Sequence, residues 1–243
     1  MVIVMQRPGQ LPIYTWTATL AVILATGCRT APVAPGEGFP GDQPVRPAPA
    51  VASTDLMEPR DATVVYKVTE GPDAGRDLVL VVVTDDQGWI ATLTGWNRVR
   101  MTRSEQGAVL THFDVDLASK VRVDYDPPIT ILPPRLAVGK PFEGDCRVQV
   151  RNLDDGSLRT RGTCQYRVEL IGRQIVTTPA GEFDAFLVRT HRHMKLTLAD
   201  AVITTLDAYG PQRGQVAHRL VKKVRLLGLV PTQSSREMRL RAQ

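Results

Sequence analysis

The sequence of 243 residues lacks the short motifs that mark common enzyme classes. It has no Gly-x-Ser-x-Gly elbow, no phosphate-binding loop, no dinucleotide fingerprint and no His-Glu-x-x-His pair, and its four histidines are scattered. Two pairs of aspartates, Asp114 with Asp116 and Asp124 with Asp126, have strand spacing, but near Pro127 we expect them in a solvated loop rather than as general acids or bases. We therefore expect a protein that is not an enzyme and that uses no cofactor.

Aromatic residues and long apolar runs are also scarce. Aromatic side chains make up 5% of the chain, so few large groups are present to fill a wide β-barrel, which favours an internal cavity. The uncharged, mostly apolar segment 11–25 has about 15 residues, whereas a membrane-spanning helix needs about 20. Arg7 precedes this segment and small residues follow it, which predicts a secretory signal peptide over residues 1–27.

The chain has three cysteines, and the first of them closely follows the apolar segment. The residues from Leu24 to Cys28, Leu-Ala-Thr-Gly-Cys, resemble the lipobox of bacterial lipoproteins. The resemblance implies that the signal is cut before Cys28 and that its thiol carries a lipid which anchors the chain to the membrane. The same residues also fit an ordinary signal peptidase, which would leave a soluble secreted protein with a free Cys28. Because Arg29 is not the Asp that retains many lipoproteins in the inner membrane, the resemblance implies the outer membrane in a Gram-negative host.

Proline and glycine are frequent in residues 28–58, where apolar periodicity is almost absent. Such a composition buries too little apolar surface to offset the entropy lost on ordering. We therefore expect a disordered tether that begins at the lipidated Cys28. The remaining residues, 59–243, are enough for a single domain with a proper core.

Successive β-strands are the dominant pattern of residues 59–243. Short segments rich in β-branched residues are bounded by turn residues, and no convincing helical period separates them. We therefore expect a mainly β fold in which an antiparallel sheet forms a partial or closed β-barrel, with a β-sandwich as the alternative. The clearest strands are expected at residues 63–68, 77–83, 89–93, 108–113 and 183–198.

The second and third cysteines flank a strong turn signal. Residues 154–156, Asp-Asp-Gly, have the composition of a three-residue hairpin loop with the glycine in the left-handed conformation. In the register set by this loop, Cys146 lies directly opposite Cys164, and Glu143 lies opposite Arg167. We therefore predict a cross-strand disulfide between Cys146 and Cys164, which an exported protein could form, with two buried reduced thiols as the alternative.

Alternation along residues 183–198 places His191 and His193 on the same face of a strand. Two histidines so close together are a weak candidate for a metal site. Arg189 and Lys195 share that face, and no Cys, Asp or Glu completes a ligand set locally. We therefore expect a solvated strand face and no bound metal.

The C-terminal part of the chain is basic, because residues 189–243 hold 11 Lys and Arg against three acidic residues. In a tethered envelope protein this excess would face anionic lipid headgroups, glycolipid or wall polymer, or would simply promote solubility. Nucleic acid is not expected as a partner, because residues 222–225, Lys-Lys-Val-Arg, lack interleaved aromatic residues for base stacking.

A second resemblance involves the residues from Thr178 to Ala185, Thr-Pro-Ala-Gly-Glu-Phe-Asp-Ala. With the alternating strand that follows, they resemble a hairpin of uncharacterised envelope β-proteins with partial-barrel folds, which are distantly similar to lipoprotein carriers that cup an acyl chain. Residues 129–139 and 209–216 are loosely similar to other stretches of the same proteins. The resemblance implies a non-catalytic binding or carrier module for an apolar or lipid-like ligand. The alternative is an anchored structural or assembly protein of the envelope that acts through its basic surface.

Overall fold

A computed structural model describes residues 38–227 and 232–242, and the expected signal peptide, the lipobox and residues 28–37 of the expected tether lie outside this part. Within it, twelve antiparallel strands form one closed barrel in the order β10-β11-β12-β13-β14-β2-β3-β4-β5-β6-β7-β9. The barrel strands are β2 (Ala62–Glu70), β3 (Asp77–Asp85), β4 (Gly88–Leu93), β5 (Asn97–Arg103), β6 (Val109–Asp116), β7 (Val121–Leu132), β9 (Phe142–Asn152), β10 (Leu158–Thr178), β11 (Gly181–Leu196), β12 (Ala199–Gly210), β13 (Gly214–Leu226) and β14 (Thr232–Ala242). The short strands β1 (Val51–Ala52) and β8 (Arg135–Leu136) form a separate pair, and α2 (Ser53–Leu56) is the helix of the described part.

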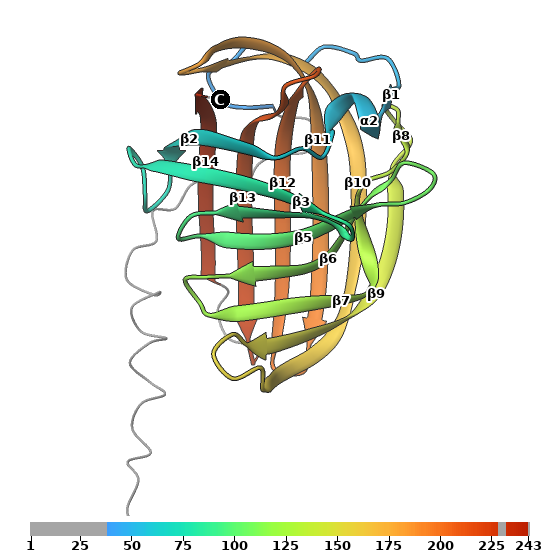
Figure 1. Cartoon of the computed structure of the whole chain (residues 1–243), viewed down its shortest axis with the longest axis vertical. Helices are drawn as coiled ribbons and strands as arrows, with labels where there is room; N and C mark the ends of the chain where they lie inside the picture. The colour runs from blue at the N-terminus through green and yellow to red at the C-terminus, as the bar shows by residue number, and fades with distance from the viewer. Residues whose placement is uncertain (1–37, 228–231, 243) are drawn as a thin grey trace, which may run out of the picture.

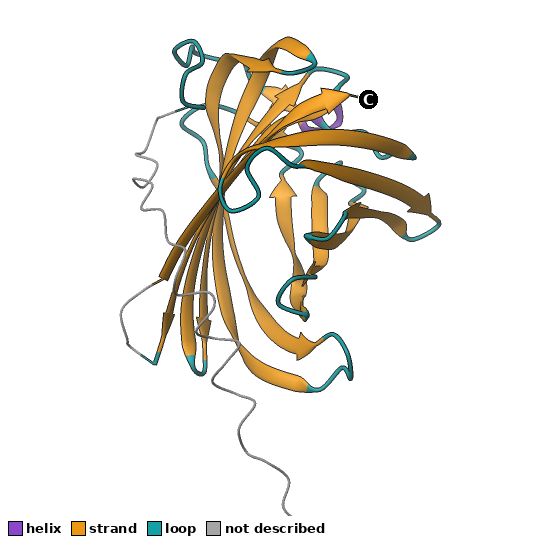
Figure 2. Ribbon diagram, turned by 90° about the vertical axis from the view of Figure 1, so that its left-hand side faces the viewer, coloured by secondary structure: helices purple, strands orange, loops and turns teal. Residues whose placement is uncertain are grey.

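Two groups of strands cross each other to make the barrel wall. In Figure 1, β11 to β14 run close to the long axis of the molecule, and β2 to β7 cross in front of them. The two groups are joined where β14 pairs with β2, and again where β9 pairs with both β7 and β10. Figure 2, the side view, shows how the long strands bend as they pass from one end of the barrel to the other. The expected antiparallel barrel is thus confirmed in its closed form, and a sandwich, which would leave free sheet edges, is not formed.

The hairpin of β10 and β11 confirms the strand expected at residues 183–198 and extends it at its start. Thr178 pairs with Gly181 around a two-residue turn, so β11 begins before Phe183. Phe186 is buried on the inner face, as the alternation predicts. Leu198 has the same parity as Phe186, but it is 55% exposed because β11 ends at Leu196 and the chain turns into β12.

The hairpin of β9 and β10 confirms the predicted register of the two cysteines. Cys146 and Cys164 are direct partners, and both are buried. The loop itself closes differently, because Leu158 pairs with Arg151 and a one-residue shift then restores the predicted register. Gly156 has a φ of 69°, the left-handed conformation that its place in the turn requires. Both cysteines are free thiols in the structure, so the disulfide stays a prediction.

Residues 38–58 are not the free tether that their composition predicts. Val51 and Leu56 belong to the hydrophobic core of the barrel, and Phe39 is only 2% exposed. The segment has few apolar residues, but these three pack against the barrel, and this tertiary contact buries enough apolar surface to order the segment. The folded domain therefore includes residues 38–58, and its expected start at residue 59 is wrong.

Residues 39–46, here called the N-terminal strap, pack against the outside of the barrel. The buried side chain of Gln174 on β10 accepts a hydrogen bond from the Phe39 backbone N–H at 2.9 Å and donates one to the Phe39 carbonyl at 3.1 Å. Gln174 is the strand partner of Ala185, whose side chain lies on the face opposite to that of Phe186. Phe39 therefore covers the outer face of β10 and β11.

Polar contacts hold the strap at its middle and at its end. Arg46 exchanges two backbone hydrogen bonds with Arg173, of 2.7 and 2.9 Å. The buried carboxylate of Asp42 forms an ion pair with Arg239 on β14, with 2.9 Å between Oδ2 and Nη1. The strap thus connects β10 with β14, which is four strands further along the chain. No helix within residues 38–227 and 232–242 has the length and apolar character to cross a membrane.

Candidate functional site: a two-sided cavity in the barrel

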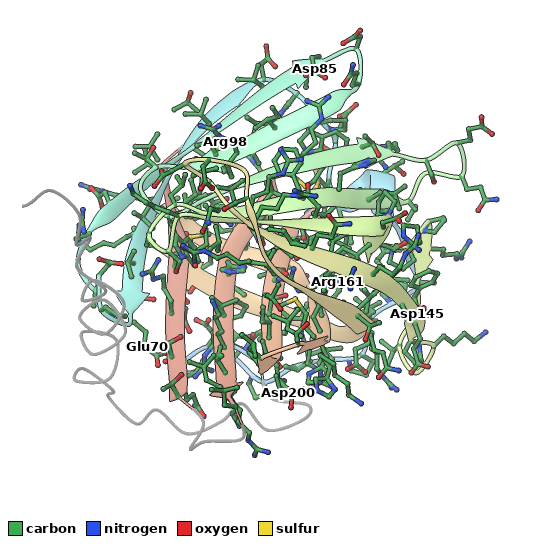
Figure 3. The ribbon with its side chains drawn as sticks, turned by 90° about the horizontal axis from the view of Figure 1, so that it is seen from below. Glu70, Asp85, Arg98, Asp145, Arg161 and Asp200 are labelled. Atoms are coloured by element: carbon green, nitrogen blue, oxygen red, sulfur yellow. The ribbon has the colours of Figure 1, made fainter. Side chains whose placement is uncertain are left out.

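A cavity with a volume of about 980 Å³ lies inside the barrel. Its size is at the upper end of the range of about 300 to 1,000 Å³ that is usual for small-molecule sites. The strands β2 to β7 and β11 to β14 contribute to its lining, together with α2 and the residues that follow it. Figure 3 looks at the barrel from below, and there the labelled acids Asp85, Asp145 and Asp200 lie around the outside of the molecule.

One wall of the cavity is apolar. Every residue of β3 and β4 that lines the cavity has an apolar side chain, and β5 adds two more beside Asn97. Alternation explains this composition, because each strand presents every second residue to the interior. This apolar wall consists of Leu80, Val82, Trp89, Ala91, Leu93, Val99 and Met101.

The opposite wall is polar. The strands β11, β12 and β13 lie on the far side of the closed strand order from β4, β5 and β6. Their cavity-lining side chains all carry hydrogen-bonding groups, apart from one glycine. This polar wall consists of Thr190, Arg192, Thr205, Asp207, Tyr209, Gln215 and His218. A cavity with such unlike walls suits a molecule that has an apolar body and a polar end.

Asp207 is the centre of a hydrogen-bond network in the polar wall. Its Oδ1 accepts hydrogen bonds from Gln215 Nε2 and His218 Nδ1, both at 2.6 Å, and its Oδ2 accepts one from Thr205 Oγ1 at 3.2 Å. The network orients the His218 ring, whose edge also contacts Trp96, with 5.8 Å between the ring centroids. The acceptors of Asp207 are therefore occupied within the protein itself.

Two tyrosines complete the polar side as neutral hydrogen-bonding groups. Tyr66 donates a hydrogen bond to the backbone carbonyl of Gln215 at 2.8 Å. Burial raises the pKa of Tyr66 and of Tyr209 above the ordinary value, and the nearby Asp207 carboxylate adds to the effect. Both phenols therefore stay protonated at neutral pH.

Arg192 is a buried cation with few partners. Its side chain is 13% exposed and points from β11 into the cavity. Nη1 donates a long hydrogen bond of 3.3 Å to the Tyr125 hydroxyl, and the Asp114 carboxylate lies 4.0 Å away. Nε has no hydrogen-bond partner. Nε is itself inaccessible, so a ligand in the cavity would reach the guanidinium through the exposed 13% of the side chain, and few acceptors surround its five donors.

Asp114 lies beside Arg192 on the inner face of β6. Burial raises the pKa of its carboxyl above the ordinary value, an effect that Asp116 strengthens and that the positive charges of Arg192 and Lys222 partly oppose. The expectation that Asp114 belongs to a solvated loop is wrong, since it lines the cavity from within a strand. Asp124 and Asp126, in contrast, lie on β7 and pair with arginines near the surface.

Asp114→Asn is expected to change how stability depends on pH. Because the folded state holds the Asp114 proton more tightly than the unfolded chain does, the wild type loses stability as the pH rises from about 4 towards the pKa of the folded state. The variant lacks this loss, so its stability relative to the wild type should increase over that window and then level off. Urea unfolding at a series of pH values measures the difference, and a constant difference would contradict the expectation.

Each histidine of the pair on β11 has a polar neighbour on β12. Nδ1 of His191 is 3.1 Å from the Thr204 hydroxyl, and Nε2 of His193 is 3.9 Å from Asp200. Both rings lie on the outer face, away from the cavity. Within residues 38–227 and 232–242, no three or more His, Cys, Asp or Glu residues come together as a ligand set.

Many of the Lys and Arg side chains in the basic C-terminal part, residues 189–243, form ion pairs. Of its 11 Lys and Arg residues, at least seven form ion pairs with acidic residues, most of which come from earlier strands. Folding therefore neutralises a charge excess that is large only along the sequence. The pairs are Arg189 with Glu169, Arg192 with Asp114, Arg219 with Glu70, Lys222 with Asp116, Arg236 with Asp73, Arg239 with Asp42 and Arg241 with Asp77.

Comparisons with known proteins add little to this geometry. No protein-family model matches the sequence, and no curated protein matches it either. Among solved structures, the crystal structure of "a putative lipoprotein" from Parabacteroides distasonis is similar over 76% of this chain and 95% of that chain, with 12% identity and a TM-score of 0.35. At this level of similarity nothing is transferred from that protein, and the function is argued from the cavity and the sequence.

Proposed function

We propose that the chain is an exported, lipid-anchored binding or carrier module whose barrel holds one small amphipathic molecule. The observation that carries this proposal is the cavity of about 980 Å³ with its apolar wall on β3 to β5 and its polar wall on β11 to β13. The polar wall changes the ligand expected from the sequence, because a purely apolar molecule would supply no acceptor for the donors of Arg192.

The anchor rests on the sequence from Leu24 to Cys28, and the strap changes its geometry. Since residues 38–58 pack on the barrel, the linker between Cys28 and the folded domain spans residues 29–37 rather than 29–58. Even when fully extended, so short a segment reaches only about 30 Å. The barrel would therefore be held close to the membrane surface, where amphipathic molecules are available.

The first test is whether a molecule is bound. We expect native mass spectrometry of protein extracted gently from the membrane to show a mass above that of the lipidated chain, and organic extraction to release the molecule. The protein emptied in this way should respond to added amphiphiles through its tryptophan fluorescence. In a chain that starts at Cys28, both tryptophans, Trp89 and Trp96, line the cavity.

The variant Ala91→Phe tests whether the bound molecule lies in the cavity. Ala91 belongs to the apolar wall, so a larger side chain there fills part of the cavity. We expect this variant to bind amphiphiles at least about tenfold more weakly than the wild type. Val83→Phe is its control, since Val83 on β3 is 54% exposed and lies outside the cavity. Absence of a bound molecule, together with an unchanged fluorescence on addition of amphiphiles, would refute the proposal.

A further inference from the structure

We propose that Arg192 binds the head group of the molecule held in the barrel, and that this molecule is an amphipathic anion with a carboxylate or phosphate head. The inference rests on the proposed function and names the chemical class of its ligand. It follows from the partners that Arg192 has and from those that it lacks.

A guanidinium carries five N–H donors in a planar fork, and a buried one is stable only when acceptors surround it. Around Arg192 the structure supplies one long hydrogen bond, to Tyr125, and one carboxylate at 4.0 Å, while Nε has no partner. A ligand carboxylate or phosphate offers two oxygens at the spacing of the fork, and so it can accept two parallel hydrogen bonds. The missing partner is therefore an anion.

The acidic residues of the cavity do not form a comparable site for a cationic ligand. The oxygens of Asp207 accept hydrogen bonds from Thr205, Gln215 and His218. Asp61 accepts hydrogen bonds from the backbone N–H and the hydroxyl of Thr84, both at 2.7 Å. Asp55 and Glu58 line the cavity with side chains that are exposed to solvent, and the Asp114 carboxylate lies 4.0 Å from Arg192 itself. The buried charge with the weakest set of partners inside the barrel is thus the positive charge of Arg192.

The surroundings of Arg192 also fit the rest of such a ligand. Thr190, which faces the cavity from the same strand, and Tyr209 on β12 add hydroxyl groups to the polar wall. Across the barrel the apolar wall presents side chains such as Leu80 and Met101. An alkyl chain could lie against these side chains while its head group contacts Arg192.

A competition experiment with three probes tests the assignment. The emptied wild-type protein is loaded with the neutral dye Nile red, which is then displaced by dodecanoate, dodecyl phosphate or dodecanol at neutral pH. We expect both anions to bind more tightly than dodecanol. Arg192→Gln should weaken binding of the preferred anion by about tenfold to a hundredfold and leave dodecanol within about twofold. The preference between the two anions distinguishes a carboxylate head from a phosphate head.

Two further variants keep the result interpretable. Arg192→Lys keeps the positive charge without the planar fork, so its affinity for the anion should lie between those of the wild type and Arg192→Gln. Arg189→Gln is the matched control, because Arg189 lies on the same strand but pairs with Glu169 at 2.8 Å on the outer face. Its affinities should equal those of the wild type, and thermal unfolding confirms that each variant is folded.

The outcomes separate this inference from the proposed function. Equal binding of dodecanol and the anions by the wild type, or an equal loss of all three with Arg192→Gln, overturns the assignment of Arg192 but leaves the binding module intact. Failure of Nile red and all three probes to bind overturns both proposals.

Discussion

Phe39→Ala is expected to lower the free energy of unfolding by about 3 kcal/mol, a typical value for deletion of a buried aromatic side chain. Phe39 is 2% exposed and belongs to a buried cluster with Val176, Ala185 and Leu187, which lie on the outer face of β10 and β11. Its removal uncovers this apolar surface and loosens the N-terminal strap.

Urea unfolding followed by circular dichroism measures this effect. Gln43→Ala is a suitable control, since the Gln43 side chain is exposed and only its backbone carbonyl accepts a hydrogen bond, from Gln174. It should change stability by no more than about 0.5 kcal/mol. A loss of similar size for both variants, or no loss for Phe39→Ala, would show that the strap does not contribute to the folded state.

The strap also shows where prediction from the sequence was bound to fail. Its composition is that of a linker. Phe39 packs on a strand whose contact residue, Gln174, is 135 residues away along the chain, and no sequence pattern connects the two. A signal was nevertheless present on the partner strand. Ala185 and Leu187 are apolar at the odd positions of β11, where the alternation otherwise predicts polar residues facing water. An apolar outer face of this kind predicts that another segment covers it.

The polar wall of the cavity also went unpredicted, because its residues lie at positions that interrupt an otherwise apolar pattern. Apolar side chains at even positions such as Phe186 and Met194 mark the inward face of β11. Thr190 and Arg192 have the same parity and therefore point inward too. A charged residue on an inward-facing position is an informative exception, because its burial has to be compensated. The contact between Arg192 and Asp114 could not be predicted from the sequence, because closure of the barrel brings β11 and β6 together.

The strands and the cysteine register were predictable because both depend on local patterns. Alternation and turn residues define each hairpin, and the register of β9 and β10 follows from the turn between them. Even here the prediction was incomplete, because Arg159 has no partner in the ladder and the loop is longer than expected. A one-residue irregularity near the turn left the pairing of Cys146 with Cys164 unchanged.

Formation of the Cys146–Cys164 disulfide is expected to raise the free energy of unfolding by about 3 kcal/mol, the value for closing a loop of roughly 15 residues. The two cysteines are direct strand partners, and both are buried in the inner core. Directly opposed residues have Cβ atoms about 4.5 to 5.5 Å apart, so a small adjustment of the strands permits the bond. An exported chain folds in an oxidising compartment, which favours it.

Protein purified from the envelope, with and without a reductant, measures this contribution. Alkylation in denaturant before reduction should leave Cys146 and Cys164 unmodified, whereas alkylation in denaturant after reduction should add two groups to the peptides that contain them. The double variant Cys146→Ala with Cys164→Ala should unfold at the same urea concentration in both conditions and serves as the control. Complete alkylation of both thiols without reductant would show instead that they remain a reduced pair inside the barrel, because burial alone then protects them from oxidation.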